Sequence, residues 1–72
     1  MKNLELIKFG QKIQFERKKR ELSQAQLAKL TNMSIHGISN IETGKTDLKY
    51  TNILQIAKAF NITPSALLDF NL

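Results

Sequence analysis

Five residues between positions 35 and 40 could contact the edges of DNA bases. Asn40 has a carboxamide that can bind adenine bidentately through N6 and N7, and Ser39 can donate to or accept from a base edge. Ile35 could touch a thymine methyl group, and His36 could hydrogen-bond on the same surface. Each could equally be an ordinary solvated surface residue. The candidate base contacts are Ile35, His36, Gly37, Ser39 and Asn40. They could read bases together only if they lie on one surface.

The surrounding sequence predicts a helix that presents these residues on one face. Ile38 and Ile41 have i, i+3 spacing, so a helix over residues 35–43 would bury both and leave the candidate residues off the buried line. Ser34, directly before this helix, is a favourable N-cap. The predicted helix therefore has a thin core face and an uncommitted polar face.

A second helix is predicted immediately upstream. Ser23 and Gln26 have the spacing of a capping box, which starts a helix at Gln24. Asn32 ends it, because asparagine tolerates the left-handed backbone that a sharp turn between helices needs. Two helices joined by a tight turn, with small polar residues on the second, are the arrangement that lies in the major groove of B-DNA. Three residues form the predicted apolar side of the upstream helix: Leu27, Ala28 and Leu30.

An amphipathic helix is predicted over residues 4–20. Its core stripe consists of Leu6, Phe9, Ile13 and Arg17. A second apolar ridge is predicted on the side away from the core and consists of Leu4, Ile7 and Phe15. Two interpretations of this ridge are open. Scattered exposed apolar residues are normal on protein surfaces, whereas a continuous ridge would bind a partner.

The C-terminal part of the chain predicts two more helices. Gly44 suits the position that ends the helix over residues 35–43, and apolar residues recur through residues 50–60 closely enough to bury much of a helix there. Thr63 and Pro64 begin a last helix as N-cap and first residue, and Leu67 should face the core. The fold class is therefore all-α, a compact bundle of five short helices in one domain spanning residues 1–72. Three residues leave apolar surface near the C-terminus: Leu68, Phe70 and Leu72.

Composition narrows the class of partner. Eleven Lys and Arg outnumber six Asp and Glu, which gives a net charge of +5 at pH 7 and a pI of about 9.8 and suits a polyanion. The sequence has no cysteine and no apolar run long enough to span a bilayer. We expect a cytoplasmic protein with no membrane, metal or cofactor partner. Basic residues cluster near the two ends of the predicted helix pair: Lys18, Lys19 and Arg20, and Lys45 and Lys49.

The sequence argues against an enzyme, because it has no nucleophile beside its one histidine, no glycine-rich phosphate loop and only six scattered acidic residues. Two non-enzymatic classes remain. One is a DNA-binding regulator. The other is a helix-turn-helix protein-interaction module, such as an antirepressor or antitoxin, that acts through the ridge of Leu4, Ile7 and Phe15. Steep salt dependence of DNA binding would favour the first, because DNA binding releases counterions.

Over residues 9–68 the chain resembles the lambda-repressor-like (Cro/CI-type, xenobiotic-response-element) helix-turn-helix regulators. Asn32 and Glu21 stand where this family usually has glycine, and Glu16 stands where an apolar residue is common. As a small, isolated domain, the chain resembles restriction-modification controller proteins and also the repressors of phages or mobile elements. The sequence does not distinguish between these two classes. The matching residues are Gln24, Leu27, Ala28, Met33, Ile38 and residues 41–45, with Gly10, Ile13, Arg17, Leu54, Ala57 and Ala59.

The resemblance implies roles for residues outside the base-reading set. In the family, the amide at the position of Gln24 binds a DNA phosphate and braces the recognition helix. The residues at the positions of Arg17 and Glu42 form a partly buried ion pair there, which would explain a charge on the core stripe of the first helix. Together with the basic loop, the expected phosphate contacts are Gln24, Ser34, Lys45, Thr46 and Lys49.

The expected function is sequence-specific regulation of transcription on double-stranded DNA. The helix over residues 35–43 would enter the major groove, and a homodimer joined through Leu68 and Phe70 would bind a palindromic operator. Because no effector domain is expected, regulation would follow from occupancy, either by blocking RNA polymerase or by contacting it. Repression and activation both remain open.

Overall fold

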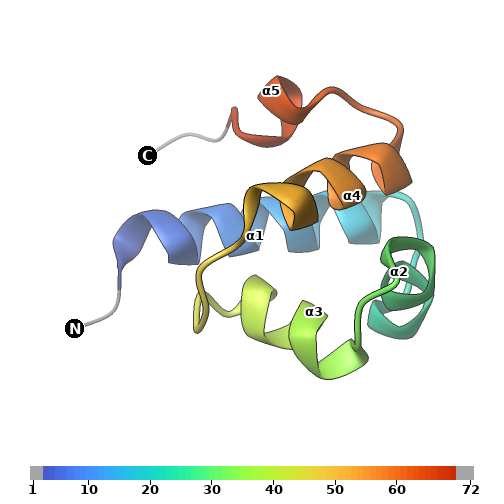
Figure 1. Ribbon diagram of the computed structural model, residues 1–72, viewed down its shortest axis with the longest axis horizontal. Helices are drawn as coiled ribbons and strands as arrows, with labels where there is room; N and C mark the ends of the chain where they lie inside the picture. The colour runs from blue at the N-terminus through green and yellow to red at the C-terminus, as the bar shows by residue number, and fades with distance from the viewer. Residues whose placement is uncertain (1–2, 70–72) are drawn as a thin grey trace.

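The computed structural model describes residues 3–69, and five helices make up its regular structure (Figure 1). This confirms the predicted all-α class, and the predicted helix over residues 50–60 has the observed bounds. Within the described residues, no helix is both long enough and apolar enough to cross a membrane. The helices are α1 (Leu4–Lys19), α2 (Gln24–Thr31), α3 (Ile35–Glu42), α4 (Tyr50–Phe60) and α5 (Pro64–Leu67).

Local capping chemistry sets the helix ends. The backbone N–H of Gln26 donates to Ser23 Oγ at 3.0 Å, and the backbone N–H of Ser23 donates to Gln26 Oε1 at 2.7 Å, which completes the predicted capping box of α2. Thr63 caps α5 by accepting from the N–H of Ala66, with proline at the first helical position. Glu21 has φ 57° at the exit of α1, so the residue that departs from the family pattern adopts the backbone usually given to glycine.

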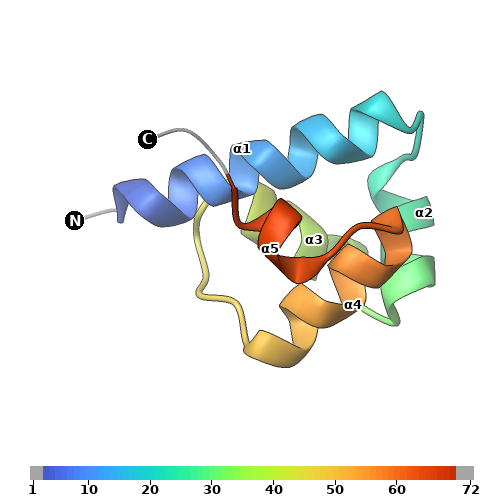
Figure 2. The same ribbon diagram turned by 90° about the horizontal axis from the view of Figure 1, so that it is seen from above.

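All five helices contribute to the core. α1 packs against α3, α2 packs against both α3 and α4, and α4 packs against α5. Figure 1 shows α5 on one side of α4 and the α2–α3 pair on the other, and Figure 2 shows α1 and α4 flanking α5. The buried apolar residues are Phe9, Ile13, Leu27, Ala28, Ile38, Ile41, Ile56, Ala57, Phe60 and Leu67. The predicted inward positions of Ile38, Ile41 and Leu67 are therefore confirmed.

Two predictions about buried apolar surface are wrong. In α4, Tyr50 is 69% exposed and Leu54 is 38% exposed, so this helix buries one stripe and not much of its circumference. Leu30 of α2 is 58% exposed. The reason is that the neighbouring helices approach α2 and α4 from limited directions, and apolar residues outside those directions meet solvent.

The prediction of a continuous apolar ridge on the outer side of α1 is also wrong. Leu4 and Phe15 are exposed, but Ile7 is half-buried and lies against Gly44, where a Cβ would come within 2.8 Å of the Ile7 Cα atom. Ile7 follows Leu4 by three residues, and with 3.6 residues per turn its side chain points about 60° away from the direction of Leu4. That rotation carries Ile7 toward the segment that follows α3.

Glu16 is buried in an ionic cluster at the end of α1, at a position where an apolar residue is common in the resembled family. Lys12 Nζ lies 2.8 Å from one carboxylate oxygen, and Arg20 Nη1 donates to the other at 2.6 Å. Arg20 also donates from Nε to the Phe60 carbonyl oxygen at 3.2 Å and lies 4.8 Å from the centre of the Phe60 ring. The cluster therefore joins the end of α1 to the end of α4.

The Glu16 cluster predicts an acid-dependent loss of stability. The hydrogen bond from Lys12, followed by that from Arg20, lowers the pKa of Glu16 from 4.5 to about 2, against the opposing effect of burial. Because the folded-state pKa is depressed, the stabilisation is complete above about pH 4.5 and is lost as the pH falls toward 2. The shift corresponds to roughly 3 kcal/mol, which solvent screening at the partly exposed Lys12 and Arg20 reduces to about 2 kcal/mol.

Urea unfolding between pH 7 and pH 2 tests this prediction on Glu16→Gln. The variant should be less stable than the wild type at pH 7 and should show a smaller further loss on acidification. Glu5→Gln, which changes an exposed glutamate on the same helix, is the matched control and should leave the acid dependence unchanged. Equal acid losses in the wild type and Glu16→Gln would show that the cluster does not carry the effect.

Candidate nucleic-acid interface

A three-residue turn joins α2 to α3. Asn32 adopts the left-handed conformation at φ 57° and ψ 34°, as predicted for the residue that ends α2. Met33 is half-buried and packs against the core, and Ser34 Oγ accepts from the N–H of Gly37 at 2.9 Å to cap α3. The turn thus fixes where α3 begins and how it leaves α2.

The five candidate base contacts share one face of α3. Ile38 and Ile41 are buried on the opposite side and anchor the helix to the core. Ile35 and His36, in the first turn, are exposed, whereas the other three candidates are half-buried. Successive residues of a helix differ by about 100° in direction, so positions 35, 36, 37, 39 and 40 fall on one continuous side of the helix. The structure therefore brings the predicted set together.

The segment between α3 and α4 exposes three of the expected phosphate contacts, Lys45, Thr46 and Lys49. Leu48 in the same segment is half-buried and packs against the core, which holds the segment to the bundle. In the described part of the chain, no side chain caps the first turn of α4, and Lys49 stands at its N-cap. Unpaired N–H groups and the helix dipole make such an end favourable for an anion. Sequence reasoning missed this feature, although a lysine at an N-cap is a usable signal.

Arg17 and Glu42 form a bidentate ion pair between α1 and α3. Arg17 Nε donates to Glu42 Oε2 at 2.6 Å, and Arg17 Nη2 donates to Oε1 at 3.0 Å. The side chains are 8% and 1% exposed, respectively, so the pair is buried as the resemblance implies. Arg17 Nη1 also donates to the Leu22 carbonyl oxygen at 2.8 Å. The hydrogen bonds to Glu42 raise the pKa of Arg17 above its ordinary value despite burial, so the guanidinium stays charged.

Gln24 joins this ion pair from the first turn of α2. Its Nε2 donates to Glu42 Oε1 at 3.1 Å, so one carboxylate connects α1, α2 and the last residue of α3. An amide nitrogen carries two hydrogens, and the inward bond uses only one of them. The second hydrogen of the half-buried Gln24 can donate to a phosphate, and the amide oxygen can accept from a bridging water.

Gly10 allows α1 and α3 to approach closely next to the ion pair. A Cβ at this position would overlap the carbonyl oxygen of Ile41 and would lie 2.7 Å from the carbonyl oxygen of Glu42. Only a hydrogen atom fits between the two backbones. Sequence reasoning matched Gly10 to the family pattern, but it did not identify the contact that excludes a side chain there.

Of the two residues expected at a dimer contact, only Leu68 lies within the described structure. Leu68, directly after α5, is 48% exposed. Phe70 lies outside the described residues.

The chain is similar to helix-turn-helix proteins across most of its length. The family model HTH_3, described as helix-turn-helix, matches residues 13–67. "Control protein C.BamHI" of Bacillus amyloliquefaciens is 39% identical over 69 residues, which cover 94% of this chain and 84% of that protein. The restriction-modification controller protein C.AhdI from Aeromonas hydrophila has 34% identity and a TM-score of 0.88, covering 90% of this chain and 98% of its own. The P22 c2 repressor bound to a synthetic operator has 34% identity and a TM-score of 0.78, covering 85% and 92%.

Proposed function

The chain belongs to the helix-turn-helix family HTH_3, and from this membership we propose that it binds a palindromic operator as a homodimer with α3 in the major groove. It is a DNA-binding regulator similar to controller proteins and repressors, and not an enzyme. One observation carries the finer proposal. The outward face of α3 gathers five residues able to contact bases, while Ile38, Ile41 and the Glu42 ion pair hold the helix from behind.

The proposed contacts divide into reading and positioning. His36 and Asn40, with Ile35, Gly37 and Ser39 beside them, contact base edges. The hydroxyl of Ser34 already accepts a bond as the cap of α3, so it would meet a phosphate as a donor. Four further residues contact phosphates: Gln24, Lys45, Thr46 and Lys49. The contact at Lys49 is supported by the first turn of α4, which has no side-chain cap and so favours an anion.

The first test compares alanine variants on a preferred duplex, recovered by selection from a random pool, and on random duplex. Lys45→Ala or Lys49→Ala should weaken binding to both and should lower the slope of log affinity against log salt by about one unit. Asn40→Ala or His36→Ala should lose about 1 to 3 kcal/mol on the preferred duplex and little on the random one. Fluorescence anisotropy titrations at several salt concentrations measure both effects.

Lys58→Ala is the matched control, because it removes an exposed positive charge at the opposite end of α4 from Lys49. It should change the salt slope less than either loop variant does. A change of sequence preference in Lys45→Ala, together with unchanged preference in Asn40→Ala, would refute this docking of α3.

The proposed dimer makes a separate prediction about the operator. Two-fold symmetry requires an inverted repeat whose half-sites lie about 10 bp apart, or a multiple of it. The partly exposed Leu68 marks the proposed contact, so Leu68→Glu should weaken dimerisation and should reduce affinity for the full operator more than for a half-site. Sedimentation equilibrium with and without DNA measures the assembly. A strictly monomeric protein at high concentration in both conditions would rule the dimer out.

The alternative of a protein-interaction module loses its main support, because Ile7 packs against the Gly44 segment and the ridge of Leu4, Ile7 and Phe15 is not continuous. DNA affinity that hardly responds to salt would revive it. As a regulator acting in the cytoplasm, the protein would work by occupancy, either by blocking RNA polymerase or by contacting it.

A further inference from the structure

α1 has one long side that no other helix of the described structure covers. Figure 2 shows α1 along one edge of the molecule, with the other helices on a single side of it. Ile13 and Arg17 are buried and point about 160° away from Phe15, at about 100° per residue. The Phe15 side chain is therefore directed outward and is 61% exposed. Leu4 lies about three turns earlier on nearly the same side, about 16 Å away along the helix axis, and is 62% exposed.

Lysines surround these two apolar side chains. Lys8 and Lys19 point about 20° and 40° to one side of Phe15, and Lys18 points about 60° to the other side. Lys18 and Lys19 are exposed and Lys8 is half-buried, and within the described part of the chain none of the three forms an ion pair. Lys12 also lies within about 60° of Phe15, but it is already paired with a carboxylate of the same helix.

Acidic residues do not neutralise this side of α1. Glu16 is buried, and its charge is offset by Lys12 and Arg20. Two exposed acidic residues, Glu5 and Glu21, stand at the two ends of the helix. The outer side of α1 is therefore positively charged over its middle and contains two exposed apolar side chains.

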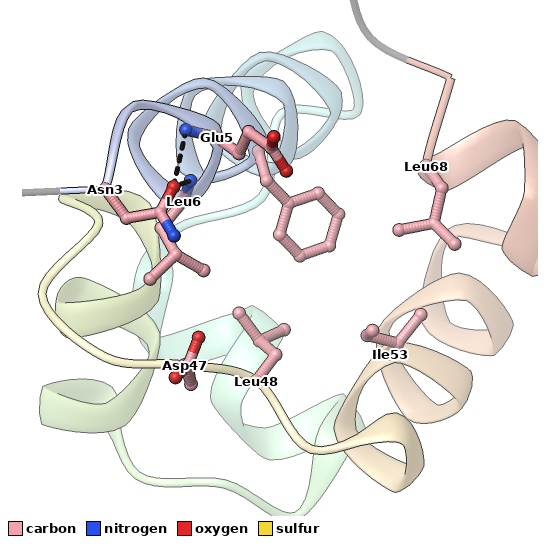
Figure 3. A pocket seen from close by; sticks show the side chains of 8 residues that line it. Asn3, Glu5, Leu6, Asp47, Leu48, Ile53 and Leu68 are labelled. Carbon is pink, nitrogen blue, oxygen red and sulfur yellow. Dashed lines mark hydrogen bonds between the residues drawn. The ribbon is translucent and has the colours of Figure 1, made fainter.

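An apolar pocket at the start of α1 has the opposite charge. The pocket has a volume of about 260 Å³, and Figure 3 shows Leu48, Ile53 and Leu68 pointing toward one shared space. Glu5 and Asp47 belong to its lining, which includes no lysine or arginine among the residues that the structure describes. An acidic partner would be repelled from this pocket and attracted to the outer side of α1.

We propose that the outer side of α1 binds an acidic amphipathic helix of a partner protein. Leu4 and Phe15 match apolar residues on one side of a facing helix of at least about three turns, since 11 residues separate them. Carboxylates beside those apolar residues pair with the lysines, whose methylene stems cover apolar surface. Aromatic side chains such as Phe15 are typical anchors of protein interfaces. We call this surface the outer face, and it consists of Leu4, Lys8, Gln11, Phe15, Lys18 and Lys19.

The apolar side chains favour a protein partner over a nucleic acid. The phosphates of a duplex would pair with the lysines but would leave Leu4 and Phe15 without an apolar contact. Gly10, which touches the backbone of α3, points about 140° away from Phe15, so the outer face is turned away from α3. An acidic helix on the outer face and DNA on α3 therefore do not exclude each other. The inference goes beyond the proposed operator binding and does not depend on it.

A synthetic helical peptide of leucine, glutamate and alanine, about 18 residues long, tests the proposal. Its leucines lie on one side, two of them 11 residues apart as in Leu4 and Phe15, and its glutamates flank them. In ¹H–¹⁵N spectra of the whole chain, the peptide should produce saturable shifts of the outer-face amides and none in α3. Phe15→Ala should lower the peptide affinity about tenfold or more and should leave the DNA affinity unchanged. Leu30→Ala, which truncates a 58% exposed leucine of α2, is the matched control and should change neither.

Charge variants test the second part of the interface. The double variant Lys18→Gln and Lys19→Gln should weaken peptide binding and should reduce its dependence on salt, because exposed charges are screened. Lys58→Gln, which removes an exposed lysine of α4, should change neither property. Equal affinity for a peptide of the same composition but scrambled order would show non-specific charge attraction and would overturn the proposal.

Two further probes identify a different kind of partner. Outer-face shifts caused by random duplex DNA or by phosphatidylglycerol vesicles, without a response to the peptide, would assign the face to that surface and would overturn the proposal. No response of the outer face to any of the three probes would overturn it as well.

Discussion

Replacing Arg17 with alanine is expected to lower the free energy of unfolding by about 3 to 5 kcal/mol, because a buried carboxylate loses its cation. The Glu42 side chain is 1% exposed, and among the described residues it would keep only the amide of Gln24 as a side-chain donor. Glu42→Ala should have a comparable effect, since it strands a guanidinium that is 8% exposed. Urea unfolding followed by circular dichroism at neutral pH measures the loss.

Two controls separate the ion pair from a general effect of charge. Lys18→Ala removes the exposed positive charge next along α1 and should change stability by less than about 0.5 kcal/mol. The double variant Arg17→Met and Glu42→Leu should recover much of the stability, because apolar side chains of similar volume often replace a buried pair without loss. An Arg17→Ala variant of unchanged stability but reduced DNA affinity would instead make Arg17 a DNA-contact residue.

Replacing Gly10 with alanine is expected to destabilise the fold by about 3 kcal/mol or more, at the upper end of the range for overpacked cores. The added methyl group would meet the backbone carbonyl groups of Ile41 and Glu42, which cannot rotate away as a flexible side chain can. Separating α1 from α3 would also stretch the bonds between Arg17 and Glu42. Helix propensity alone predicts the opposite sign, a gain of about 0.5 to 1 kcal/mol for glycine to alanine.

Gly37→Ala is the matched control in a helix interior. Its added methyl would lie 3.1 Å from Ser34 Oγ and 4.0 Å from Met33 Cε, so only side-chain atoms are near. We expect a change of stability below about 1 kcal/mol, the size of the propensity term. Denaturant midpoints of the two variants and the wild type give the comparison. Equal midpoints for the wild type and Gly10→Ala would show that α1 and α3 separate at little cost.

Helix positions and the outward face of α3 were determined by the sequence itself. The Ser23 capping box, Asn32 in the turn and the Thr63 cap depend on residues at most a few positions apart, and these local bonds form as predicted. The spacing of Ile38 and Ile41 likewise places the candidate base contacts opposite the core. The partner of Arg17 came from the family resemblance, because no local rule joins residues 25 positions apart.

Exposure and close contact were decided only by the tertiary structure. A period of 3.6 residues says which side chains share a direction, but it does not say whether another helix lies in that direction. Tyr50, Leu54 and Leu30 therefore meet solvent although their spacing suggested burial, and Ile7 packs against the segment after α3 although its spacing suggested exposure.

The same limit applies to the interior contacts of α1. The i, i+4 spacing of Lys12, Glu16 and Arg20 allowed an ionic cluster, but its burial depends on Phe60, which the fold brings from 40 residues beyond Arg20. Whether Gly10 tolerates a methyl group depends on how closely α1 and α3 approach. Such distances depend on how all five helices pack together, so they cannot be predicted from residues that are neighbours in the sequence.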